Sequence, residues 1–161
     1  MSNRLAGYLE VKEKCPYVYF IIKSTYIYIG QTQSNPIIRW NSHLQIQGEF
    51  KKHLMEKDIE LALSDNEINF YVFSCEEILE YSTQITVRRN TEYIEGLLTT
   101  KFFESNLAGN YTVISSCDNA PIDSDKSEFL DKIVEEIMLK FTDLILENTK
   151  KLGNDQNIFC F

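Results

Sequence analysis

The stretch YVYFIIKSTYIYIGQTQSNPIIRWNSH, residues 17–43, decides the fold of this chain. Residues 18–22 and 26–29 are β-branched and aromatic, which is typical of strands. The polar residues 23–25 between them predict a hairpin turn, and Gly30 closes the second strand. The sequence therefore predicts a β-hairpin that carries several tyrosines.

A helix is predicted directly after this hairpin. Pro36 stands where a first helical turn begins, and the helix runs to residue 47, just before Gly48. Arg39 and His43 are four residues apart and so lie on one face of this helix. Tyrosines, an arginine and a histidine are thereby brought near one end of the hairpin.

The remaining chain predicts a mixed α+β fold. Its expected elements are a helix over 51–63, a buried strand over 68–75, a helix over 90–104, a loop over 106–121 in which 111–114 is an optional strand, and a terminal helix. The fold class is thus α/β (α+β), with a small central three-stranded, mostly antiparallel sheet flanked by helices.

The terminal helix has the clearest pattern of all. Apolar residues repeat at three and four from Phe129 to Ile145, and Asp125 and Glu128 offer a capping-box start. We expect an N-terminal extension over 1–15, one module over 16–120 and a C-terminal helical extension over 121–161. That extension either packs on the module or forms a homodimer interface.

Composition narrows the class of protein. A chain of 161 residues with 43% hydrophobic residues is long enough for one buried core and too short for two ordinary domains. The N-terminal sequence does not resemble a signal peptide, and no run approaches the ~18 apolar residues of a membrane span, so we expect a cytoplasmic protein without membrane contact. The four cysteines lack the paired spacing of a zinc site or disulfide framework, and we expect reduced thiols.

The net charge of −8 weighs against a sequence-blind nucleic-acid binder, because phosphate contacts need lysine and arginine. The acidic excess is spread along the chain, so a local basic surface matters more than the total. Candidates for that surface are Arg39, His43, Lys51, Lys52, His53, Arg88, Arg89 and Lys101. Binding to DNA is then expected to be modest and steeply salt-dependent, or to need a dimer or partner.

The hairpin and the later helix together resemble the GIY-YIG nuclease family over roughly residues 16–111. Residues 17–19 stand in place of the GIY element, with Tyr17 where the family has its first glycine, and residues 28–30 are the YIG element intact. Residues 31–32 continue that element, although Gln31 stands where some members carry a lysine. Arg39 and His43 match the family's first helix, and the segment YIEGLLTTKF, residues 93–102, matches a later one.

The resemblance implies a metal-dependent DNA endonuclease that hydrolyses phosphodiester bonds. It gives Tyr19 the role of general base or water activator, with Tyr28 in support, and it places Arg39 on the scissile phosphate. Glu95 is implied as the protein ligand of Mg²⁺ or Mn²⁺, since one carboxylate can anchor an ion that keeps most of its waters. A phenol titrates near 10, so we expect Arg39 and the metal to lower the tyrosine pKa.

Further residues complete the expected site. His43 either relays a proton or holds a tyrosine hydroxyl, and Asn106 braces the site, with Asn110 as the alternative. Pairs of basic residues contact the DNA backbone if DNA lies across this face, although solvated charge is the more frequent role of such pairs. These pairs are Lys51 with Lys52 and Arg88 with Arg89.

Two other functional classes stay open. A catalytically degraded module that binds nucleic acid or protein would keep the fold while Tyr17 and Gln31 impair the site. An interaction protein would use the acidic terminal helix as its functional surface. Retention of all five residues favours the nuclease, namely Tyr19, Tyr28, Arg39, His43 and Glu95.

Overall fold

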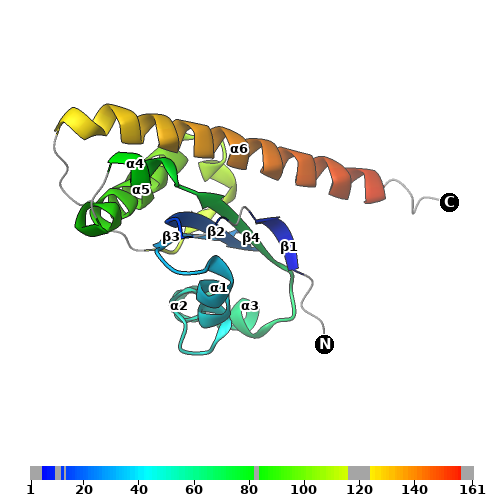
Figure 1. Ribbon diagram of the computed structural model, residues 1–161. Coiled ribbons are helices and arrows are strands. Elements are labelled where there is room, and N and C mark those ends of the chain that lie inside the picture. Colours follow the sequence, from blue (N-terminus) through cyan, green and yellow to red (C-terminus); the bar gives the residue numbers. More distant parts are fainter. Residues whose placement is uncertain (1–4, 10–11, 13, 82–83, 116–123, 157–161) are drawn as a thin grey trace.

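The computed structural model describes residues 5–9, 12, 14–81, 84–115 and 124–156. A mixed β-sheet lies between two layers of helices (Figure 1). Its five strands occur in the order β1-β4-β2-β3-β5. They are β1 (Leu5–Leu9), β2 (Tyr17–Lys23), β3 (Tyr26–Thr32), β4 (Ile68–Ser74) and β5 (Thr112–Val113).

The centre of the sheet is antiparallel, as predicted. Strand β2 pairs with β3 on one side and with β4 on the other, so that Tyr19 lies opposite both Gly30 and Val72. The prediction of three strands was incomplete, because β1 and β5 add parallel edge strands beside β4 and β3. Both edges are pairings between segments far apart in the sequence, and β1 belongs to the segment expected to be an N-terminal extension.

Helices cover both faces of this sheet (Figure 1). On one side lie α1 (Pro36–Leu44), α2 (Glu49–Lys57) and α3 (Ile59–Leu63). On the other lie α4 (Glu77–Tyr81), α5 (Gln84–Glu104) and the long α6 (Ser124–Gln156), and a short 3-10 turn, Ala108–Asn110, precedes β5.

The single helix expected over residues 51–63 was wrong. It is divided at Asp58, whose extended backbone ends α2 and whose carboxylate accepts a hydrogen bond from the Leu61 amide at 2.9 Å. Asp58 therefore acts as the N-cap of α3.

Alternation along β2 divides the interior into two cores. Val18, Phe20 and Ile22 pack toward α5 and α6, whereas Tyr17, Tyr19 and Ile21 pack toward α1–α3. Because successive side chains of a strand point to opposite faces, one seven-residue strand contributes to both cores.

Helix α6 is part of the first core. The ring of Phe141 stacks on Phe20 with centroids 3.9 Å apart, and both side chains are fully buried. The expected packing of the C-terminal helix on the module is therefore present, whereas a homodimer interface stays a prediction.

Two further predictions concern membrane-spanning segments and the cysteine thiols. No helix in the described ranges has the length and apolarity that crossing a membrane requires. Cys15 and Cys75 are buried thiols, and Cys117 and Cys160 lie outside the described residues.

Candidate active site

A polar cavity of about 230 Å³ opens between the hairpin, α1, α2 and α5. Its walls are made by Tyr19, Tyr28, Gln31, Arg39, Glu49, His53 and Glu95. Four of the residues expected at the site, two tyrosines, an arginine and a glutamate, thus surround one space although they come from four elements.

The hairpin register explains how Tyr19 reaches this cavity. Gly30 lies opposite Tyr19, and a Cβ atom at Gly30 would lie 2.5 Å from the Tyr19 hydroxyl oxygen. The glycine therefore leaves the space that the tyrosine ring occupies, and the ring lies over the neighbouring strand with its side chain fully buried.

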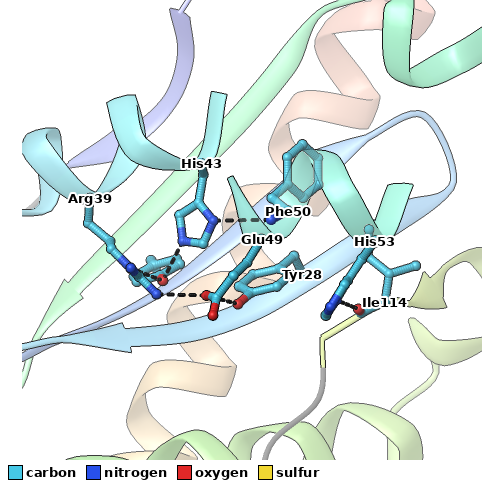
Figure 2. A network of polar contacts seen from close by, with 8 residues as sticks. Tyr28, Arg39, His43, Glu49, Phe50, His53 and Ile114 are labelled. Atoms are coloured by element: carbon cyan, nitrogen blue, oxygen red, sulfur yellow. Dashed lines mark hydrogen bonds and ion pairs between the residues drawn. The ribbon is translucent and has the colours of Figure 1, made fainter. Parts of the chain in front are cut away.

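Hydrogen bonds fix the tautomer of His43. The Phe50 amide donates to His43 Nδ1 at 3.3 Å, so that nitrogen carries no proton (Figure 2). Burial, together with the charge of Arg39, lowers the pKa of His43 to about 4, so the ring is neutral near pH 7. Its proton is therefore on Nε2, which donates to the Tyr19 hydroxyl oxygen at 2.7 Å. Of the two expected roles of His43, this geometry matches holding a tyrosine hydroxyl.

The Tyr19 oxygen accepts a second hydrogen bond, from Arg39 Nε at 3.2 Å. With two donors on this oxygen, the hydroxyl proton of Tyr19 is left for a water or ligand in the cavity. Burial nevertheless raises the pKa of Tyr19 to about 12, outweighing the hydrogen bond and charge of Arg39. The expectation that Arg39 lowers this pKa is correct in direction, but desolvation is the larger effect.

Glu49 joins the other tyrosine to the arginine (Figure 2). One carboxylate oxygen accepts from the Tyr28 hydroxyl at 3.1 Å and from Arg39 Nη2 at 2.8 Å. The side chains of Arg39 and Glu49 are 36% and 58% exposed. An ion pair this exposed contributes little stability and can be exchanged for another anion.

His53 is a further polar group of the cavity wall. Its Nδ1 lies 2.6 Å from the Ile114 carbonyl oxygen, which can only accept, so Nδ1 is the protonated nitrogen (Figure 2). In the neutral ring, Nε2 is then a free acceptor, with no bond to another described residue.

Glu95 is the carboxylate that α5 contributes. Burial, together with the nearby carboxylates of Glu92 and Glu49, raises its pKa to about 8, against the charge of Arg39. Its side chain makes no hydrogen bond or ion pair with another described residue. A cation in the cavity would stabilise the ionised carboxylate, because an opposite charge favours the charged form.

The fit to a divalent cation follows from these oxygen atoms. The carboxylate groups of Glu95 and Glu49 line one cavity, and such oxygens are the ligands that Mg²⁺ and Mn²⁺ prefer. Within the described residues, no three His, Cys, Asp or Glu side chains group closely enough to hold a metal ion by themselves. The residues fit an ion held by one or two carboxylates, with water or substrate oxygens as its other ligands.

Other expected site residues lie outside the cavity wall. Asn106 is exposed in the turn after α5, and Asn110 is exposed at the end of the 3-10 turn. Arg88 and Arg89 are exposed on α5, where Arg88 pairs with Glu92 at 2.8 Å. Lys51 and Lys52 follow Glu49 on α2; Lys52 is exposed and Lys51 lines a different cavity.

Sequence reasoning missed Glu49 and assigned His53 only to a basic surface. Glu49 is the first residue of α2, and its position depends on the turn between α1 and α2. His53 is oriented by a carbonyl group of the segment that follows β5. The available signal was helical spacing, since Glu49 and His53 are four residues apart and so share one face of α2.

Comparisons with known proteins found no relative of this chain. No family model matches the chain, and neither a curated protein nor a solved structure matches it.

Proposed function

We propose that the protein is a metal-dependent DNA endonuclease with a site of the GIY-YIG type. The observation that carries the proposal is the convergence of Tyr19, Tyr28, Arg39 and Glu95 on one cavity, with His43 bonded to Tyr19 from behind. These are the residues that the family resemblance implies.

Arg39 is the proposed phosphate ligand. Its planar guanidinium is suited to two phosphate oxygens, and it is partly exposed at the cavity. The phosphate would take the place of the Glu49 carboxylate on Nη2, while Nε keeps its bond to Tyr19. Phosphate binding and tyrosine positioning are thus linked through one side chain.

Glu95 is the proposed metal ligand. Once a phosphate has displaced the Glu49 carboxylate from Arg39, Glu49 would be available as a second ligand of the metal. A bound Mg²⁺ or Mn²⁺ would supply charge neutralisation for the phosphorane and for the leaving oxygen. The carboxyl of Glu95 must lose its proton for this role. With a pKa of about 8 before metal binds, metal affinity should rise with pH through that value.

Two groups are placed to remove a proton from the attacking water. Tyr19 has its oxygen held by two donors, but a pKa of about 12 makes a phenolate rare near neutral pH unless a cation lies close by. His53 has Nε2 free as an acceptor and lines the same cavity. A residual cleavage rate in Tyr19→Phe that no longer rises at alkaline pH assigns the proton removal to Tyr19, whereas loss of the pH dependence in His53→Gln assigns it to His53.

DNA is the proposed partner and the cytoplasm the proposed compartment. Lys51, Lys52, Arg88 and Arg89 are the proposed backbone contacts, and a homodimer through α6 would double their number. Because these contacts would be made by lysine and arginine, we expect DNA binding to weaken steeply as salt increases, and the net charge of −8 should keep its affinity modest.

The test is cleavage of supercoiled and branched DNA at low salt with Mg²⁺ or Mn²⁺. We expect metal-dependent nicking by the wild type, and its loss in Glu95→Ala and in Tyr19→Phe. Glu104→Ala is the matched control, because Glu104 is an exposed carboxylate at the end of α5 and is absent from the cavity wall. Nicking that survives in both site variants would assign the activity elsewhere.

A binding module without catalysis is the second candidate, and one observation favours it. The Glu49 carboxylate rests on the guanidinium that would hold phosphate. If folded wild type cleaves no substrate with either metal but still binds nucleic acid or protein, the module is the better description.

A further inference from the structure

A second cavity lies under α2 and α3, at the other end of β2. It measures about 130 Å³, and its polar wall consists of Lys23, His43, Lys51, Ser64, Asp65 and Asn66. Lys23 is four residues beyond Tyr19 on the same face of the strand, which is about 13 Å along β2. His43 and Lys51 also have roles in the proposed nuclease, but none of those roles uses Lys23.

Lys23 is a covered ammonium group with too few acceptors. Its side chain is 3% exposed, and Nζ donates one hydrogen bond, to the Ser64 carbonyl oxygen at 2.8 Å. An ammonium group has three donors, so two are left for whatever fills the cavity. Among the described residues, no carboxylate forms an ion pair with Lys23.

The charges around Lys23 make this arrangement costly without a further anion. Lys51 lines the same cavity and repels Lys23, whereas Asp65, which attracts it, is solvent-exposed. Burial and the charge of Lys51 both lower the pKa of Lys23. Covering a charged group is unfavourable unless it is paired and hydrogen-bonded, so an oxyanion between the two lysines would relieve both costs.

We propose that this cavity binds a single phosphate group, held by the ammonium groups of Lys23 and Lys51 and bounded by the Asn66 side chain. Its small volume suits one tetrahedral oxyanion rather than a nucleoside. Inorganic phosphate and the terminal phosphate of a nucleic-acid strand share this chemistry. The site shares Lys51 with the proposed DNA contacts, but it needs neither Arg39 nor Glu95 and can be tested separately from cleavage.

Calorimetric titration of the full chain with inorganic phosphate, against chloride at equal ionic strength, tests the proposal. We expect saturable binding that falls at least about tenfold in Lys23→Met, which keeps the aliphatic stem but loses the charge-assisted bonds. Lys51→Met should weaken binding as well, and it serves as the decisive variant if Lys23→Met does not fold. Lys57→Met is the control, because it removes one exposed charge from α2 outside this cavity.

Arg39→Met separates this site from the nuclease cavity. Retained phosphate binding in Arg39→Met, with loss in Lys23→Met, supports the proposal whether or not the protein cleaves DNA. Loss in Arg39→Met, full retention in Lys23→Met and Lys51→Met, or no saturable binding by wild type would overturn it. Competition by a 5′-phosphorylated oligonucleotide, but not by its unphosphorylated twin, would identify a strand terminus as the source of the phosphate, and equal failure of both would identify free phosphate.

Discussion

The two faces of the central sheet differ in what their aromatic residues do. On the face toward α5 and α6, the rings of Phe20 and Phe73 pack edge to face, and Phe141 of α6 stacks on Phe20. On the face toward α1–α3, Tyr19 and Tyr28 are equally well covered, but each hydroxyl group has polar partners. The first face is held by packing, with a hydrogen bond from α6, from Asn148 Nδ2 to the Tyr71 hydroxyl at 2.8 Å, whereas the second combines packing with a connected set of hydrogen bonds.

This difference shows how one hairpin can serve stability and chemistry together. Alternation in β2 and β3 directs phenylalanine, valine and most of the isoleucines to the first face, and the tyrosines and Ile21 to the second. A buried tyrosine stabilises through its ring and still presents a polar atom at its tip. The second face can therefore hold ionisable groups in states that cost stability, because the first face supplies the packing.

The largest effect is expected from Glu95, which α5 contributes to the wall of the candidate site. In metal-free protein its folded pKa of about 8 lies above its ordinary value of 4.5, so the folded state holds the proton more tightly than the unfolded chain. Stability is therefore retained at acid pH and lost as pH rises from about 4.5 to about 8, by up to about 5 kcal/mol. Glu95→Gln should remove this loss, since the amide stays neutral.

Urea unfolding with a chelator, at about pH 5 and about pH 9, measures the effect. The groups that set the Glu95 pKa are Glu92, Glu49 and Arg39, and all stay in place in Glu95→Gln. Glu104→Gln is the control, because Glu104 is exposed at the end of the same helix. Parallel pH dependence in wild type and Glu95→Gln would show that Glu95 is not held protonated.

On the packing face, Phe141→Ala should cost about 4 kcal/mol of unfolding free energy, through lost burial and the cavity left against Phe20. The control is Leu139→Ala on the same helix, whose side chain is 67% exposed and should change stability little. Equal and small effects of both substitutions would mean that α6 does not pack on this sheet in solution. They would favour the alternative, in which α6 forms a homodimer interface.

Much of the fold was predictable because its signals are local. The strand runs at 18–22 and 26–29 and the helix start at Pro36 each depend on neighbouring residues. Strand β1 escaped prediction because it is short, contains Gly7 at a φ of +146°, and is defined by pairing with β4, about 60 residues further along the chain. The division of α2 from α3 had a local signal, the capping carboxylate of Asp58, which the apolar spacing obscured.

The candidate site was predictable where a motif fixed it and not elsewhere. Tyr19, Tyr28, Arg39 and Glu95 were named from the sequence, and all line the cavity. Glu49 was not, since its contact with Arg39 depends on how the turn after α1 places the next helix. No motif indicates such a contact between two helices.

A substitution at Gly30 tests whether stability and the position of Tyr19 can be changed separately. In Gly30→Ala the new methyl group would lie 2.5 Å from Tyr19 ring atoms, so the ring must leave its bonds to His43 and Arg39. We expect a stability loss of about 2 kcal/mol from this overpacking, together with loss of DNA cleavage. Gly109→Ala is the control, because a methyl group there meets open space. Cleavage at the wild-type rate in Gly30→Ala would show that the position of Tyr19 is unimportant.

The smallest effect is expected at Glu49, and its sign is the informative part. If phosphate replaces this carboxylate on Arg39, Glu49→Gln should tighten DNA binding at low salt by up to about fivefold, because an exposed ion pair of modest strength no longer competes. Glu56→Gln, on the same helix, changes the net charge equally without touching Arg39, so it separates this local effect from general repulsion. Fluorescence anisotropy with labelled duplex DNA measures both. Weaker binding in Glu49→Gln would mean that the carboxylate positions Arg39 and Tyr28 for the ligand instead of blocking Arg39. The cavity would then be already arranged for binding.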